Sequence, residues 1–321
     1  MLKGLVTVLL CLGLILISSF AGQSWISVSS AFDASSQDHG IFWSIRVPRT
    51  VLAMFAGAAL AISGMVFQGI FRNALATPYT LGVASGVSLG AIIGIKYFSF
   101  ASIYFISSTI FGALIGAVVS MLLLMLITRY VSAYESVTLL LAGVALNFLF
   151  SSSIMFAQYT SDFVESFRAV RWIMGGVDIV GYDFLYCLLP LFLIGLLMVV
   201  FFLPELDQIS LGEEEAMSRG VDLLKSRNYL IIGASTLVAS VVSVTGPIGF
   251  IGIIIPHICR ILFGPGHKKL AFYSLIVGAS FLVFSDMMSR IFLAPNELPV
   301  GVITSIVGAP FFIWVLFRTN R

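Results

Sequence analysis

Charged side chains are scarce in this sequence. Aspartate, glutamate, lysine and arginine make up 10% of the 321 residues, against about 25% in soluble globular domains. Apolar residues take their place, because 59% of the chain is hydrophobic and a further 29 residues are glycine. This composition excludes an ordinary water-soluble protein and indicates an integral membrane protein.

Cysteine, histidine and net charge are equally limited. The three cysteines, Cys11, Cys187 and Cys259, stand alone in apolar runs, and the three histidines do not cluster at the spacing of metal ligands. We therefore expect no disulfide, no metal site and no cofactor. The net charge of +2 gives no broad positive field, so we expect no nucleic-acid partner.

The motifs of nucleotide-binding and catalytic proteins are missing. The sequence has no GxxxxGK[ST] loop, no GxGxxG after a strand, and neither GxSxG nor HExxH, so we expect no catalytic residues and no ATP hydrolysis by this chain. Ionisable groups within apolar runs are also few, although proton- or sodium-driven transporters usually need them. Asp286 and Arg290, at i and i+4, favour a structural ion pair, and a proton relay with His257 is the alternative. The energy source for transport is expected outside the chain.

Long apolar runs predict an all-α integral membrane protein with about ten transmembrane helices in a single domain, residues 1–321. Each run approaches the roughly 20 residues that a helix needs to cross the hydrocarbon core. The ten predicted spans are about 4–22, 50–70, 80–98, 103–127, 136–158, 184–203, 227–245, 247–263, 270–293 and 299–317.

Two details of this topology have alternatives. Lys3 precedes an apolar core and Ser19-Phe20-Ala21 is typical of a cleavage site, so the first run is either a span or a signal peptide. The chain turns at Thr245-Gly246-Pro247, or the two runs on either side are one broken helix. With ten spans, eleven of the seventeen basic residues fall on the cytoplasmic side, which predicts that both termini are cytoplasmic.

Small residues recur at helical spacing in two of the predicted spans. Stripes of this kind allow helix backbones to approach closely, so we interpret them as packing surfaces and not as ligand sites. They consist of Ala53, Gly57 and Ala61 in one span and of Gly82, Gly86, Gly90 and Gly94 in the next.

The predicted span 136–158 carries unusual polarity. Asn147, Ser151 and Gln158 fall near one face of this helix. Polar side chains within a membrane are costly and usually face protein or a water-filled path. They therefore either line a translocation path or form hydrogen bonds between helices, and both interpretations remain open.

Charge is concentrated in one predicted cytoplasmic loop, residues 204–227, which holds nine of the 32 charged residues. Glu213, Glu214 and Glu215 follow Gly212, and acidic residues in a first turn favour a helix. We predict a short helix between Gly212 and Gly220. The loop is expected to meet a soluble partner, and a plain solvated connection is the alternative.

Several ordered motifs between about residues 43 and 318 resemble the FecCD-type family of iron-siderophore and cobalamin ABC importer permeases. The amino-terminal motifs are Arg46-Val47-Pro48-Arg49, the run from Ala56 to Gly64, Gln68-Gly69, Arg72-Asn73, Leu75-Ala76 and Pro78 to Leu81-Gly82. The later ones are Gly246 to Gly252, Pro256-His257, Arg260, Glu297 to Gly301 and Gly308 to Phe312.

The resemblance implies a type II ABC importer permease with ten spans in the bacterial inner (cytoplasmic) membrane. It further implies a second permease copy, identical or paralogous, two cytoplasmic ABC ATPase subunits, and a periplasmic substrate-binding protein. A gradient-driven secondary transporter and a membrane enzyme are the less favoured classes. By the same resemblance the cargo is a ferric siderophore, carried from the periplasm to the cytoplasm, with cobalamin or haem as alternatives.

The resemblance also assigns roles to particular residues. Residues 212–220 are implied to be a coupling helix that rests on the ATPase, with Gly212, Glu213, Glu214, Ala216 and Gly220 as coupling residues; small Ala216 is expected to face the ATPase. Arg46, Arg49 and Arg290 are implied to dock the binding protein on the periplasmic side. Asn147, Ser151 and Gln158 are expected to line the translocation path.

Overall fold

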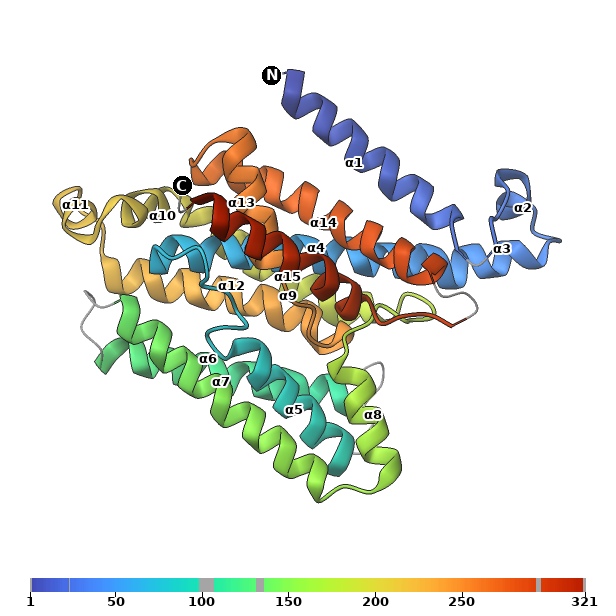
Figure 1. Cartoon of the computed structure of the whole chain (residues 1–321), viewed down its shortest axis with the longest axis horizontal. Coiled ribbons are helices and arrows are strands. Elements are labelled where there is room, and N and C mark those ends of the chain that lie inside the picture. The colour runs from blue at the N-terminus through green and yellow to red at the C-terminus, as the bar shows by residue number, and fades with distance from the viewer. Residues whose placement is uncertain (1, 23, 98–106, 131–135, 293–295, 320–321) are drawn as a thin grey trace.

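The computed structural model of the chain describes residues 2–22, 24–97, 107–130, 136–292 and 296–319. This part of the chain is all-α, as predicted, and contains no β-strand (Figure 1). In chain order the elements are α1 (Leu2–Phe20), α2 (Val28–Phe32), α3 (Gln37–Ile41), the π-helical turn η1 (Phe42–Arg46), α4 (Val47–Phe71), α5 (Val83–Tyr97), α6 (Ser108–Tyr130), α7 (Ser136–Tyr159), α8 (Phe163–Ile173), α9 (Phe184–Phe201), α10 (Leu203–Leu211), α11 (Glu213–Ser218), α12 (Leu223–Thr245), α13 (Ile251–Phe263), α14 (His267–Phe292) and α15 (Val300–Thr319).

Every predicted span corresponds to a helix. Seven helical segments in the described part of the chain are long and apolar enough to cross a membrane. At the remaining three positions lie α5, α13 and the segment Val300–Ile313 of α15, which are shorter apolar helical stretches. Ten crossings and their orientation stay predictions. The chain between residues 245 and 251 separates two helices, α12 and α13, so these runs are not one broken helix.

Helix α4 forms the centre of the bundle and packs against α12, α13 and α14. Glycines bring these backbones together, as the small-residue stripe predicted. A Cβ atom at Gly57 would overlap the carbonyl oxygen of Gly278 on α14, and one at Gly64 would overlap that of Gly252 on α13. The buried centre of α4 therefore depends on residues without side chains.

The second glycine stripe joins α5 to α6. Gly86 and Gly90 of α5 lie against Gly112 and Gly116 of α6, so closely that a Cβ at Gly90 would overlap the Gly112 carbonyl oxygen. Gly82 differs from the prediction, because it lies in the turn before α5 with φ +82°. It approaches α7 and not α6.

We expect Gly90→Ala to destabilise the fold by about 1–3 kcal/mol, because the added methyl group forces the α5 and α6 backbones apart. Gly13→Ala on α1 is the matched control, since a Cβ there would meet no atom within 4 Å. Thermal unfolding of the purified protein checks this pair. Equal melting temperatures for the two variants would contradict close α5–α6 packing.

The helices run between two ends of the bundle (Figure 1). One end holds α10 and α11 and is called the α11 end. The other, called the Arg49 end, holds α2, α3 and the start of α4. The amino-terminal half of α1 and the carboxyl-terminal half of α15 both run toward the α11 end (Figure 1). This arrangement agrees with the prediction that both termini and the charged loop lie on the same side of the membrane. That this side is the cytoplasm stays a prediction.

Candidate functional site

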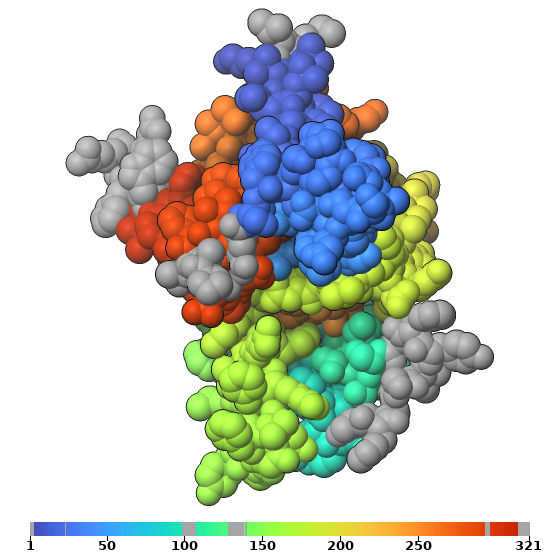
Figure 2. Space-filling model, turned by 90° about the vertical axis from the view of Figure 1, so that its right-hand side faces the viewer, coloured from blue at the N-terminus to red at the C-terminus, as the bar shows by residue number. Residues whose placement is uncertain are grey.

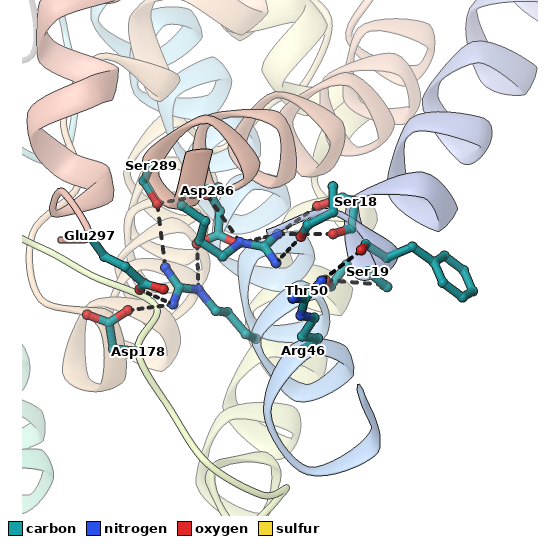
Figure 3. A network of polar contacts seen from close by, with 12 residues as sticks. Ser18, Ser19, Arg46, Thr50, Asp178, Asp286, Ser289 and Glu297 are labelled. Carbon is teal, nitrogen blue, oxygen red and sulfur yellow. Dashed lines mark hydrogen bonds and ion pairs between the residues drawn. The ribbon is translucent and has the colours of Figure 1, made fainter. Parts of the chain in front are cut away.

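At the Arg49 end, one buried guanidinium group gathers three carboxylates. Arg49 lies in the first turn of α4 and is 5% exposed. Its Nε donates to Oδ1 of Asp286 at 2.7 Å, and its Nη1 donates to Oε2 of Glu297 at 2.6 Å. Oδ1 of Asp178 lies 2.9 Å from the same Nη1. Figure 3 shows the three acids converging from α14 and from the segments that follow α8 and precede α15.

Arg290 and Arg46 hold the carboxyl end of α1. Arg290 forms an ion pair with Asp286 at 3.1 Å, as the i, i+4 spacing predicted, and donates to the carbonyl oxygen of Ala21 at 2.8 Å. Arg46 donates to the carbonyl oxygens of Phe20 and Ser24, both at 2.7 Å. Cations are favourable here because the last carbonyl groups of a helix lack intrahelical partners and carry partial negative charge. The two arginines therefore fasten the end of α1 to η1, directly before α4, and to α14.

The structure brings Arg46, Arg49 and Arg290 together but does not expose them. Their exposed fractions are 8%, 5% and 4%, and Figure 2 looks onto this end, where α2 and α3 (blue) cover the surface. In this chain by itself, carboxylates and carbonyl groups of the same chain already occupy the guanidinium groups. Their role in docking a binding protein stays a prediction, and the geometry supports a role in holding the helix ends together.

Helix α8 was not predicted from the sequence. Asp162 caps it by accepting from the backbone N–H of Glu165 at 2.7 Å, and the Glu165 carboxylate accepts from the Asp162 N–H in return. Aspartate followed three residues later by glutamate is the sequence signature of such a capping box, so the signal was available. Arg168 and Arg171 of α8 are exposed.

A hollow of about 590 Å³ lies beside α8 and α15. Of the three predicted path residues, Gln158 lies in the wall of this hollow. Asn147 and Ser151 lie earlier in α7, outside its lining, and are partly exposed. The lining from α15 and from the turn before α13 was missed, because all of it except Ser305 is glycine, proline or apolar and carries no polar signal. The lining residues are Gln158, Val170, Ile173, Met174, Pro247, Gly249, Gly301, Val302, Ser305 and Ile306.

At the opposite end, α11 confirms the predicted short helix. Gly212 precedes it with φ +145°, and Gly220 follows it with φ +82°, conformations that favour glycine. The N–H of Gly220 donates to the carbonyl oxygen of Met217, and that of Val221 donates to the carbonyl oxygen of Ala216. This is the Schellman pattern of helix termination, so α11 is a compact helix between two glycines.

The inward face of α11 corrects part of the sequence interpretation. Ala216 is 0% exposed and packs in this chain's own core, so its side chain does not face a partner. Glu213 is 4% exposed, and its Oε1 accepts from Arg227 at 2.6 Å. Glu214 and Glu215 are exposed. The helix was predicted correctly, but which of its residues face outward depends on contacts distant in sequence.

Within the described residues, no group of three or more His, Cys, Asp or Glu side chains could hold a metal ion. The three acids at the Arg49 end surround a guanidinium group instead. Asp286 is committed to Arg49 and Arg290, which leaves a proton relay through Asp286 and His257 without support from the geometry.

Comparison with known proteins extends along nearly the whole chain. A family model described as the FecCD transport family matches residues 9–318. The chain is 37% identical to the vitamin B12 import system permease protein BtuC of Escherichia coli O157:H7 (strain EC4115 / EHEC), over 98% of this chain and 95% of that protein. It is 33% identical to the hemin transport system permease protein HmuU of Yersinia pestis, over 98% of this chain and 93% of that protein. A solved structure described as an inward-facing metal-chelate type ABC transporter superposes with a TM-score of 0.87 and 30% identity, over 98% of both chains.

Proposed function

This chain belongs to the FecCD transport family, and we propose that within this family it carries a ferric siderophore from the periplasm to the cytoplasm. It is the permease of a type II ABC importer, since the family match spans residues 9–318 and the fold match covers 98% of the chain. It is a transport subunit and not an enzyme in its own right, as its relatives are transport permeases.

The proposed complex lies in the bacterial inner membrane with both termini of this chain in the cytoplasm. It contains a second permease copy, identical or paralogous, two cytoplasmic ATPase subunits and a periplasmic binding protein. The observation that carries the ATP-driven mechanism is α11, a glycine-bounded helix whose exposed Glu214 and Glu215 lie at the end toward which both termini point. A compact helix can sit in a groove of an ATPase and move as one body.

The identity of the cargo is a separate part of the proposal. The names of the relatives give vitamin B12 for BtuC and hemin for HmuU, so cobalamin and haem are the alternatives to a ferric siderophore. The experiment is a binding assay on the purified periplasmic protein that serves this permease, with a ferric siderophore, cobalamin and hemin compared at equal concentration. Binding of the ferric siderophore alone supports the proposal, and binding of cobalamin or hemin alone replaces it.

The translocation path is proposed to run along α7, between this chain and the second permease copy. Gln158 lines the 590 Å³ hollow, and the apolar side chains of Phe148 and Phe156 on α7 are 69% and 70% exposed. Asn147 and Ser151 add weak polarity, which suits a bulky cargo because no tight site delays its release.

Cysteine labelling tests the path directly. We expect a water-soluble thiol reagent to label Ser151→Cys in at least one nucleotide state of the assembled transporter, because this position faces the path. Leu149→Cys is the neighbouring control; Leu149 is 58% exposed in the isolated chain, and we expect lipid to shield it. Labelling of Leu149→Cys without any labelling of Ser151→Cys would refute the assignment.

A further inference from the structure

One buried carboxylate at the α11 end joins three helices. Oε1 of Glu213 accepts from Nη2 of Arg227 at 2.6 Å and lies 3.8 Å from Nη2 of Arg72. Arg227 belongs to the first turns of α12, and Arg72 is the residue that ends α4, with φ +47°. Glu213 therefore connects the start of α11 to the ends of two long helices.

This connection is shielded from water on most sides. The side chains of Glu213 and Arg227 are 3% and 10% exposed, and that of Arg72 is 40% exposed. A buried ion pair contributes little net stability, because desolvation of both charges offsets their attraction. Breaking it by removing one partner is costly for the same reason. The contact thus fixes geometry more than it adds stability.

Because α11 has a glycine at each end, a fixed contact is needed if a displacement of α11 is to reach the neighbouring helices. Gly212 and Gly220 have backbone conformations that few other residues adopt, and the chain at these points offers no side chain to resist rotation. Without another contact, α11 would pivot on its two glycines when pushed. Ala216 packs inward but presents only a methyl group, so the directional contact on this face is Glu213.

We propose that Glu213 is the positioning residue that passes a displacement of α11 to α12 through Arg227, and to α4 through Arg72. The inference rests on the proposed function, in which an ATPase moves α11. It assigns Glu213 a contact inside the permease, whereas Glu214 and Glu215 on the exposed face are left for the ATPase.

Distances between the two permease copies test this proposal, with spin labels in the complete transporter and the native cysteines replaced. Met217→Cys reports the movement of α11, and Leu224→Cys reports that of α12; these side chains are 43% and 59% exposed. Each distance is measured without nucleotide and with ATP plus vanadate. We expect both distances to shift in the otherwise unchanged protein. In Glu213→Gln, the Met217 distance should still shift, and the shift at Leu224 should be lost.

Two further variants isolate the ion pair. Glu205→Gln is the matched control, because Glu205 is a partly buried carboxylate on α10 that forms no ion pair among the described residues; it should retain both shifts. The charge-exchanged variant Glu213→Arg with Arg227→Glu should restore the shift at Leu224, which a general loss of stability would not allow.

The outcomes distinguish a failure of the inference about Glu213 from a failure of the proposed function. A Leu224 shift that persists in Glu213→Gln overturns the inference. No Met217 shift in the otherwise unchanged transporter overturns the proposed function instead, because ATP then does not move α11. Should Glu213→Gln fail to assemble, Arg227→Gln decides: a reduced Leu224 shift supports the connection to α12, and an unchanged one overturns it.

Discussion

Replacing Asp286 by alanine is expected to lower the free energy of unfolding by about 3–5 kcal/mol, the usual cost of removing one partner from a buried ion pair. Asp286 is 0% exposed and stands between two guanidinium groups, those of Arg49 and Arg290. Without this carboxylate, the buried guanidinium groups of Arg49 and Arg290 lose the negative charge that they share. Unfolding of the purified protein with increasing SDS or temperature measures the effect.

Glu297→Gln is the control for this prediction. Glu297 bonds the same Arg49, but its side chain is 33% exposed, so water can solvate the charges that remain. We expect a cost of about 1 kcal/mol or less, as for exposed ion pairs. Equal destabilisation by the two variants would contradict the view that Asp286 is the centre of the network.

Replacing Ala216 by tryptophan is expected to abolish uptake and stimulated ATP hydrolysis together, while the chain still inserts into the membrane. The reason is internal to the chain, since Ala216 lies on the inward face of α11 and is 0% exposed. An indole has no room there and displaces the helix outward; overpacking of this kind costs about 1–3 kcal/mol, small enough for the remaining spans to fold.

Ala216→Ser is the matched control, because serine adds a single oxygen atom to the same position and should retain transport. Uptake and ATP hydrolysis are measured on complexes whose assembly has been checked by mass. Transport at the normal rate by an assembled Ala216→Trp complex would show that the position of α11 does not matter for coupling.

Local patterns predicted those features that depend on neighbours in sequence. The helices follow from apolar runs, the close packing of α5 follows from Gly86 and Gly90, and α11 follows from acidic residues between two glycines. Each needs only helical periodicity or the conformational freedom of glycine. The structure therefore confirmed helices close to the expected bounds, while their membrane crossings stay predictions.

Contacts between distant residues were not predictable in the same way. Glu297 lies 248 residues beyond Arg49 in sequence, and nothing in either segment indicates that they meet. The sequence therefore did not predict that Arg49 is buried among carboxylates of its own chain. The inward orientation of Glu213 likewise depends on Arg227 and Arg72, which belong to two other helices.

We propose that ATP hydrolysis by a partner ATPase drives transport through this chain. The most direct measurement is uptake by cells that express the permease with its ATPase, after ATP hydrolysis is blocked by mutation of the ATPase, or after an uncoupler is added while ATP is maintained. We expect the ATPase mutation to abolish uptake and the uncoupler to leave it intact. Uptake that survives the mutation and stops with the uncoupler would contradict the proposal and identify a gradient-driven transporter.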